Sequence, residues 1–265
     1  MKDLKAACIS IKSDVGSLNE NLDRIKSRAA AAKQEGADLV LFPELSLTGY
    51  TTSAPENIAI DRQDPSIKTL SNLAQELGLI ICFSFAEKCQ DKCYITACVT
   101  DGESCHFYRK IHLGFAESKV FSAGEKIQTI ETDKASLGIS ICVESHMAPL
   151  FEIYRKQGVE IMLLPYASGM SGDTCKANWR KVLPCRANDM GVYVLACNLL
   201  KESSGGGMCI LDPKGNVLDE YYGKEEHMIL CDLKNDLPRN HPDGDMRNIS
   251  YYDRQRPDVY EKYRN

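Results

Sequence analysis

The chain has 265 residues, of which 43% are hydrophobic and 26% are charged, a composition typical of a globular protein with a sizeable core. Its formal net charge of -5 argues against broad binding to nucleic acid or to anionic membranes, which requires basic patches. No apolar run approaches the roughly 20 residues that span a bilayer, and the N-terminal segment lacks the apolar core of a signal peptide. We therefore expect a cytoplasmic protein with no nucleic-acid or membrane partner.

The first predicted helix follows a short strand at the N terminus. Ser17 and Glu20 have the spacing of a capping box, and apolar side chains then recur at helical spacing until Gly36. The short apolar segment 38–42 comes next and stops at Pro43, a pattern that predicts a buried strand.

This arrangement occurs twice along the chain. A basic helix end, a glycine, an apolar strand and a proline occur in that order at 33–43 and again at 155–165. A second helix–glycine–strand unit follows each of them, at 70–85 and at 179–197, so the two halves share a β-α-β-α-β layout. Helices on one side of each sheet leave the other face apolar, and stacking the two sheets buries both faces. The sequence predicts a four-layer α-β-β-α sandwich in a single domain, 1–265.

Two further features affect this prediction. Pro184 falls within the last helical segment, where it predicts a kink or a restart of the helix. The segment 235–265 is irregular and contains several prolines and tyrosines. We expect it to form an extended arm that packs at a subunit interface, in a homodimer or a higher homo-oligomer.

The twelve cysteines are explained mainly by packing. Reduced cysteine behaves as a small hydrophobe within apolar strands. The cysteines in or beside such runs are Cys8, Cys82, Cys98, Cys197, Cys209 and Cys231. A disulfide scaffold is not expected in a long chain without a secretory signal. Cys89 and Cys93 are separated by three residues, and no second close pair follows, so we expect no zinc or other metal.

Three reactive side chains stand at the end or flank of strand-like segments. Cys142 ends the apolar run 137–141, Glu44 follows Pro43, and Lys110 follows another candidate strand. The carboxyl ends of strands are where α/β proteins build their sites. A thiol, a carboxylate and an ammonium group supply a nucleophile, a base and an oxyanion stabiliser. Each residue has an alternative interpretation. Cys142 is then a core cysteine, Glu44 a charged residue in a turn, and Lys110 one member of a solvent-exposed Arg–Lys pair.

Taken together, these segments resemble a known family. The segments 42–50, 108–113 and 138–142 look like the three catalytic motifs of the nitrilase superfamily of carbon–nitrogen hydrolases. The segment 117–124 is similar to the loop that carries that family's second glutamate, and 254–260 is similar to its closing arm. The resemblance covers nearly the whole chain, and the ordered set of motifs is highly specific.

The resemblance implies an α-β-β-α fold that is usually paired into dimers. It implies that Glu44 is the general base, Lys110 the oxyanion partner and Cys142 the nucleophile. Glu117 would be a second carboxylate that positions substrate or water. The residues that we expect to contact the substrate are Tyr50, Val143 and Glu144.

The implied activity is hydrolysis of a non-peptide C–N bond in a small linear amide or N-carbamoyl compound. It would proceed through a thioester on Cys142, use water and no cofactor, and release ammonia or an amine. Val143 stands where relatives often carry an aromatic residue, which reshapes the pocket wall and leaves the substrate open. The alternatives are nitrile hydrolysis, acyl transfer to an amine, and a non-catalytic relative that binds metabolites or partners. The presence of all four catalytic positions counts against the last alternative.

Overall fold

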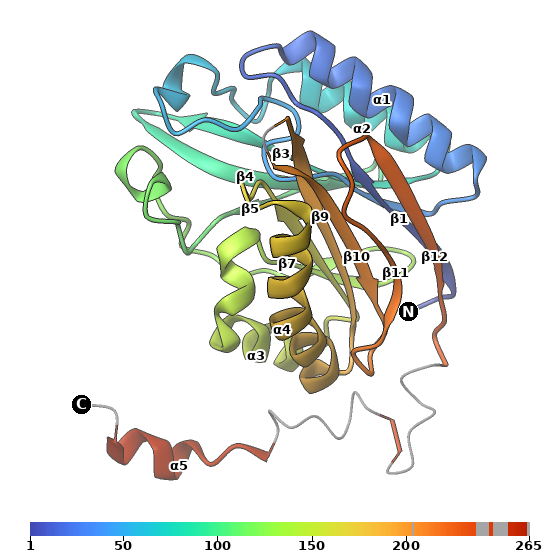
Figure 1. Cartoon of the computed structure of the whole chain (residues 1–265), viewed down its shortest axis with the longest axis vertical. Coiled ribbons are helices and arrows are strands. Elements are labelled where there is room, and N and C mark those ends of the chain that lie inside the picture. The colour runs from blue at the N-terminus through green and yellow to red at the C-terminus, as the bar shows by residue number, and fades with distance from the viewer. Residues whose placement is uncertain (203, 237–243, 246–253, 264–265) are drawn as a thin grey trace.

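The computed structural model describes residues 1–202, 204–236, 244–245 and 254–263. Two six-stranded sheets form its body, and helices cover the outer face of each sheet (Figure 1). This architecture confirms the predicted four-layer α-β-β-α sandwich. Parts of the expected C-terminal arm, 237–243 and 246–253, lie outside the described residues.

The two sheets have the same plan. Each contains three neighbouring parallel strands, followed by two antiparallel strands on one side and a single antiparallel strand on the other. The first sheet has the order β12-β1-β2-β3-β4-β5, with β1 at Leu4–Ser10, β2 at Leu39–Leu41, β3 at Ile80–Cys89, β4 at Lys92–Thr100, β5 at Cys105–Arg109 and β12 at His227–Leu233. The second has the order β11-β10-β9-β8-β7-β6, with β6 at Ile130–Glu131, β7 at Ser136–Ile139, β8 at Ile161–Tyr166, β9 at Tyr193–Lys201, β10 at Gly205–Leu211 and β11 at Val217–Tyr221.

The helices connect the parallel strands, as the repeated sequence pattern predicted. The longer helices are α1 at Leu18–Gln34, α2 at Pro65–Leu77, α3 at Ala148–Lys156 and α4 at Gly172–Met190. The first half is thus β1-α1-β2-α2-β3 and the second is β7-α3-β8-α4-β9. Figure 1 shows α1 and α2 together on one side of the sandwich and α3 and α4 on the other.

Three apolar clusters fill the spaces between the four layers. Strand β2 contributes side chains to two of these clusters, because successive side chains of a strand point to opposite faces of the sheet. Leu39 and Leu41 enter the cluster between the two sheets, whereas Val40 packs under α1 and α2. The third cluster joins the outer face of the second sheet to α3 and α4 and includes Trp179. Burial of both faces of each sheet is therefore the main source of its stability.

Two local predictions differ from the structure. Ser17 stands at the N-cap of α1, but its side chain makes no capping hydrogen bond because its backbone, with φ -86° and ψ 62°, lies outside the extended region favoured by that motif. Helix α4 continues through Pro184 without a restart, so the predicted restart is wrong. Packing of Leu183 and Ala187, on either side of the proline, into the third cluster holds this helix in place.

All twelve cysteines are unpaired, and Cys8, Cys82 and Cys197 lie in the cluster between the sheets. Cys231 is only half-buried, in contrast to the other five that were expected in the core.

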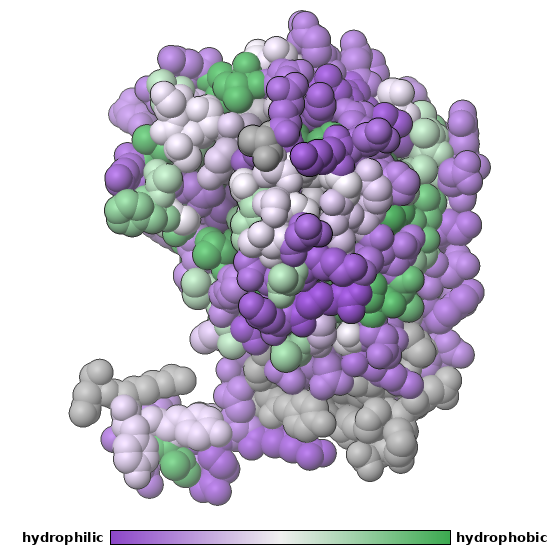
Figure 2. All heavy atoms as spheres, viewed as in Figure 1, coloured by the Kyte–Doolittle hydropathy of each residue, from purple (hydrophilic) through white to green (hydrophobic). Residues whose placement is uncertain are grey.

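Among the described residues, no helix is long and apolar enough to cross a membrane. The face in Figure 2 is mostly hydrophilic, with scattered small apolar patches.

Candidate active site

The site forms where the carboxyl ends of parallel strands from both sheets meet. Glu44 follows β2 of the first sheet, and Cys142 follows β7 of the second. The backbone N–H of Glu44 donates to the carbonyl of Tyr166, the last residue of β8, at 3.2 Å. This hydrogen bond links the two sheets at the strand ends where, as predicted, the reactive residues lie.

A tight turn fixes the position of Glu44. Leu45 adopts a positive φ of 54°, which is unfavourable for a branched side chain and is held by its surroundings. The hydroxyl of Ser84 on β3 accepts the N–H of Leu45 at 2.6 Å and donates to the carbonyl of Pro43 at 2.9 Å. Glu44 is fully buried as a result, although nothing in its local sequence marks it as a core residue.

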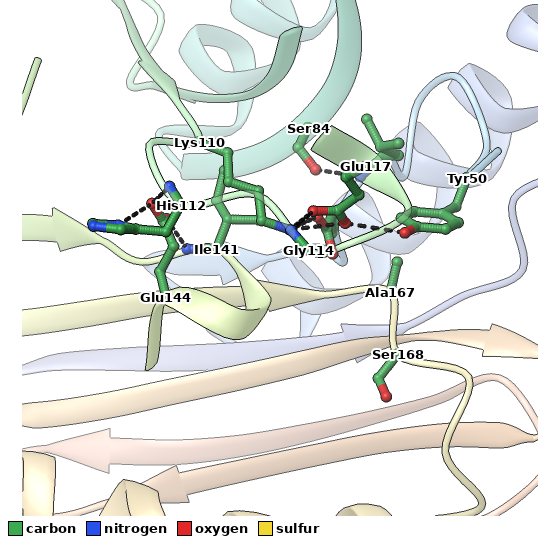
Figure 3. A network of polar contacts seen from close by, with 12 residues as sticks. Tyr50, Ser84, Lys110, His112, Gly114, Glu117, Ile141, Glu144, Ala167 and Ser168 are labelled. Atoms are coloured by element: carbon green, nitrogen blue, oxygen red, sulfur yellow. Dashed lines mark hydrogen bonds and ion pairs between the residues drawn. The ribbon is translucent and has the colours of Figure 1, made fainter. Parts of the chain in front are cut away.

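Lys110 lies between two carboxylates. Its Nζ donates to Oε1 of Glu44 at 2.7 Å and to Oε1 of Glu117 at 3.0 Å, and the lysine is 1% exposed (Figure 3). Burial lowers the pKa of Lys110, but the nearby charges of Glu44, Cys142 and Glu117 outweigh burial, so its pKa is raised overall. The ammonium group therefore stays protonated at neutral pH.

Glu117 occupies a short 3-10 helix, Glu117–Lys119, and is oriented by donors from three directions. Besides Lys110, it accepts the N–H of Gly114 at 2.7 Å and the hydroxyl of Tyr50 at 3.0 Å (Figure 3). Tyr50 follows Gly49, whose φ of 83° and close approach to the backbone of Val15 exclude a side chain there. Tyr50, expected at the substrate, thus directly contacts the second carboxylate.

Cys142 begins a 3-10 helix, Cys142–His146, immediately after β7 and a short extended link. Its φ of 54° places it in the left-handed region, a conformation that costs about 1–3 kcal/mol for a residue other than glycine. Such a strained turn between a strand and a helix presents the side chain of its residue to a site. Cys142 therefore lies at a strained turn between a strand and a helix.

Burial and charge set the protonation of the thiol and its neighbouring carboxylate. Burial, together with the negative charge of Glu44, raises the pKa of Cys142 to about 12, although Lys110 opposes this shift. Burial also raises the pKa of Glu44, against the attraction of Lys110. The backbone N–H of Ala167 acts in the opposite direction and lowers the pKa of both groups, but by less than burial raises it. The raised pKa makes the Glu44 carboxylate a stronger base toward the thiol, whereas the raised pKa of Cys142 opposes loss of the thiol proton.

Glu144 has a different place from the one expected. It is fully buried, and Oε1 accepts the N–H groups of Ile111 at 2.8 Å and His112 at 3.0 Å, while Oε2 accepts the N–H of Ile141 at 2.7 Å (Figure 3). The hydroxyl of Tyr108 donates to both oxygens, at 2.9 and 3.0 Å. Protein donors occupy the whole carboxylate, so this geometry does not fit the expected contact with substrate. Instead, Glu144 joins the segment after Lys110 to the residue before Cys142.

A cavity of about 350 Å³ opens beside Cys142. Val143 lines it, as expected, and Tyr166, Ser168 and Trp179 lie on its other walls. Sequence reasoning missed the residues after β8, although Pro165 repeats the position of Pro43 and so pointed to the loop that follows it. The site thus combines a half-buried thiol, a buried carboxylate and a buried ammonium group next to a space for a small molecule.

Comparison with known proteins identifies the chain's relatives. The family model of carbon-nitrogen hydrolases matches residues 5–239. The chloroplastic omega-amidase of Arabidopsis thaliana is 30% identical over 261 residues, covering 88% of this chain and 69% of the relative. The omega-amidase NIT2 of Mus musculus is 31% identical over 241 residues and covers 84% of each chain.

Solved structures have the same fold. An amidase from Nesterenkonia sp. superposes with a TM-score of 0.83 at 21% identity, over 98% of this chain and 96% of that one. Nit3 of Saccharomyces cerevisiae, a member of branch 10 of the nitrilase superfamily, gives a TM-score of 0.79 at 26% identity, over 89% and 92% of the two chains. In one variant of the Nesterenkonia amidase, the acetamide moiety of fluoroacetamide is covalently added at the active-site cysteine.

Proposed function

This chain belongs to the carbon–nitrogen hydrolase family, and we propose that it hydrolyses the C–N bond of a small linear amide or N-carbamoyl compound through a thioester on Cys142. Cysteine-dependent amide hydrolysis agrees with the amidases among its relatives. The observation that carries the proposal is the buried contact of Lys110 with both Glu44 and Glu117 beside the strained turn of Cys142.

The first step is addition of the thiol to the substrate carbonyl. Glu44 removes the proton from Sγ of Cys142 as the sulfur attacks the carbonyl carbon, because the raised thiol pKa leaves little free thiolate at neutral pH. The C–S bond forms and the carbonyl π electrons move to oxygen. Lys110 and the N–H of Val143 stabilise this oxyanion.

The second step releases the amine product and regenerates the enzyme. The protonated Glu44 gives its proton to the departing nitrogen, the C–N bond breaks, and a thioester remains on Cys142. Water then attacks the thioester carbon while Glu44 again accepts a proton. The C–S bond breaks, the acid is released, and Glu44 returns its proton to the departing sulfur, which restores the thiol. Glu117, held by Tyr50 and Gly114, keeps the ammonium group of Lys110 in place.

The test is ammonia release across a panel of small amides, N-carbamoyl amino acids, N-carbamoyl amines and nitriles. We expect release from amides or carbamoyl compounds by the wild-type protein and none by the folded Cys142→Ala variant. Equal release by the variant would contradict the role of the thiol. Release from nitriles alone would favour nitrile hydrolysis, and amide loss that depends on an added amine would favour acyl transfer. A silent panel with a Cys142 that resists alkylation would favour the non-catalytic alternative.

We propose further that the protein is a cytoplasmic homodimer or higher homo-oligomer. Support comes from the end of the chain, where α5 at Pro257–Tyr260 and the 3-10 helix Glu261–Tyr263 lie away from the sandwich in Figure 1. Tyr260 is 46% and Tyr263 is 81% exposed, which suits residues that pack on another copy. Sedimentation of the full chain and of a chain ending at residue 236 tests the proposal. A mass of one chain for both would contradict it.

A further inference from the structure

A second cavity, of about 380 Å³, opens on the outer face of the first sheet. The loop before α2, the strands β4 and β5, and the segment 123–128 form its walls. None of its lining residues belongs to the cavity beside Cys142. We call it the basic cavity, because its lining includes four cationic side chains, Arg62, Lys92, Arg109 and Lys126.

The alternation of side chains along the strands explains why this face becomes polar here. On β3, Phe85 packs in the apolar cluster beneath α1 and α2, and Glu87 is the next residue that points to the same face. On β5, Phe107 packs against that cluster, and Arg109 is the next residue on its face. The neighbouring Lys110 reaches the active site instead. The basic cavity is therefore separate from the catalytic groups, although its strands also lead to them.

Glu87 orients both arginines of the basic cavity. This carboxylate is 1% exposed, and its oxygens lie 3.0 and 2.6 Å from Nε and Nη2 of Arg109. They lie 2.7 and 3.1 Å from Nε and Nη2 of Arg62. The guanidinium group of Arg109 also lies 3.8 Å from the ring centre of Tyr94, and that of Arg62 lies 4.7 Å from the ring centre of Phe107. Because these contacts already hold the two cations in place, little conformational entropy is lost when an anion binds to them.

Both arginines keep hydrogen-bond donors for a further anion. A guanidinium group has five N–H donors in a planar fork. Glu87 engages Nε and Nη2 of each arginine, and Arg109 also hydrogen-bonds Cys89. Each group therefore retains at least two donors. The side chains of Arg62 and Arg109 are 38% and 25% exposed, so a solute can reach these donors.

The charge around the basic cavity is unbalanced. Burial favours a higher pKa for Glu87, but its hydrogen bonds, including those from both arginines, outweigh burial and lower the pKa, so this group is a carboxylate at neutral pH. Glu87 and the exposed Glu125 are two carboxylates beside four cations, which leaves a net charge of +2. The whole chain has the opposite sign, with a formal net charge of -5. A local excess of positive charge attracts an anion, and a dianion would neutralise it.

The arrangement of the donors favours phosphate over carboxylate. The cations approach the space from three segments of the chain, namely the loop before α2, the strands β4 and β5, and the segment 123–128. A tetrahedral phosphate group presents oxygen atoms in several directions, whereas the two oxygens of a carboxylate lie in one plane. Arginine pairs well with phosphate, through two parallel N–H···O bonds. The volume is near the lower end of the roughly 300–1,000 Å³ that small-molecule sites occupy, which fits a small phosphate compound.

We propose that the basic cavity binds a small phosphate-containing anion, with Arg62 and Arg109 as its main contacts and Lys92 and Lys126 as weaker ones. Glu87 is a positioning residue in this site, because it holds the two guanidinium groups side by side and takes up part of their charge. The inference concerns a second site and stands independently of the proposed amide hydrolysis.

Calorimetric titration of pyrophosphate into the full chain, at neutral pH and about 0.15 M salt, tests the proposal. We expect saturable binding of one anion per chain, and binding of the dicarboxylate malonate that is weaker by at least about tenfold. Arg62→Met should weaken the binding of pyrophosphate by about 10- to 100-fold, the range for loss of a charge-assisted hydrogen bond. Arg62→Lys should recover only part of the affinity, because it keeps the charge and loses the planar fork.

Surface variants keep the test decisive if Arg62→Met fails to fold. Lys92→Met and Lys126→Met alter exposed side chains and should each lower the affinity by about two- to fivefold. Glu125→Gln removes the exposed carboxylate and should raise the affinity by a similar factor, about two- to fivefold. Lys26→Met, on the exposed face of α1, is the matched control and should change nothing. Absence of binding at this salt concentration, equal binding of malonate, or one affinity shared by all the variants would overturn the proposal.

Discussion

Replacement of Glu144 by glutamine tests how the two halves of the site are held together. The substitution keeps the size of the side chain and changes one acceptor oxygen into a donor NH2 group. Oε2 accepts the N–H of Ile141, and Oε1 accepts those of Ile111 and His112. In either orientation of the amide, at least one buried N–H group loses its acceptor and faces another donor.

The expected magnitude follows from these bonds. A buried donor without an acceptor costs about 1–3 kcal/mol. The remaining hydrogen bonds change from a charged to a neutral acceptor. This change weakens each of them by roughly 0.5–1 kcal/mol. We therefore expect Glu144→Gln to lower the free energy of unfolding by about 3–5 kcal/mol. Because Ile111 follows Lys110 and Ile141 precedes Cys142, we also expect kcat to fall by at least about tenfold.

The assay combines urea unfolding at pH 7 with ammonia release from the best amide of the panel. Tyr108→Phe is the matched control, since it removes one donor to Glu144 and leaves the three backbone N–H bonds intact. We expect this control to lose only about 1 kcal/mol and to retain most of its activity. A Glu144→Gln variant within 1 kcal/mol of wild type and with normal kcat would refute the reasoning.

Two further predictions concern the buried charges. Lys110→Met removes the shared partner of Glu44 and Glu117, so we expect a loss of about 3–5 kcal/mol in urea unfolding and of about 100- to 1,000-fold in kcat; normal turnover would exclude Lys110 as the oxyanion partner. The thiol pKa of about 12 predicts that alkylation of Cys142 by iodoacetamide, measured by peptide mass spectrometry, still rises between pH 9 and 11. Because the folded protein holds this proton more tightly than the unfolded chain, whose thiol pKa is near 9.0, the thiol's contribution to stability is present below pH 9 and decreases as the pH rises toward 12. A plateau of the alkylation rate near pH 9 would contradict that shift.

The sequence was most informative where a local pattern has a direct physical consequence. The apolar run in 38–42, which stops at Pro43, predicted a buried strand, and the glycine–strand–proline spacing at 36–43 and 158–165 predicted two equivalent halves. Ser17 shows the limit of such patterns. Its residue type and spacing located the start of α1, but its backbone angles were set by the preceding turn, so the capping bond is not formed.

Residue roles were harder to predict where they depend on the direction of a side chain. Glu144 follows Cys142 by two residues, which suggested a contact with substrate. The 3-10 helix that begins at Cys142 instead turns this carboxylate toward the backbone after Lys110.

The sequence by itself determined the layered fold and the identity of the reactive groups. Periodicity of two and of 3.6 residues specifies which face of each element is buried, and burial of those faces dictates a sandwich. The tertiary structure alone decided which remote groups share one space. Lys110 and Glu44 are 66 residues apart and follow β5 and β2 of the first sheet. Cys142 follows β7 of the second sheet, so the stacking of the two sheets brings the thiol to the carboxylate and the ammonium group. The physical reason is that a pattern of burial constrains each segment separately, whereas contacts between loops, and the pKa shifts that they cause, depend on how the packed sheets align.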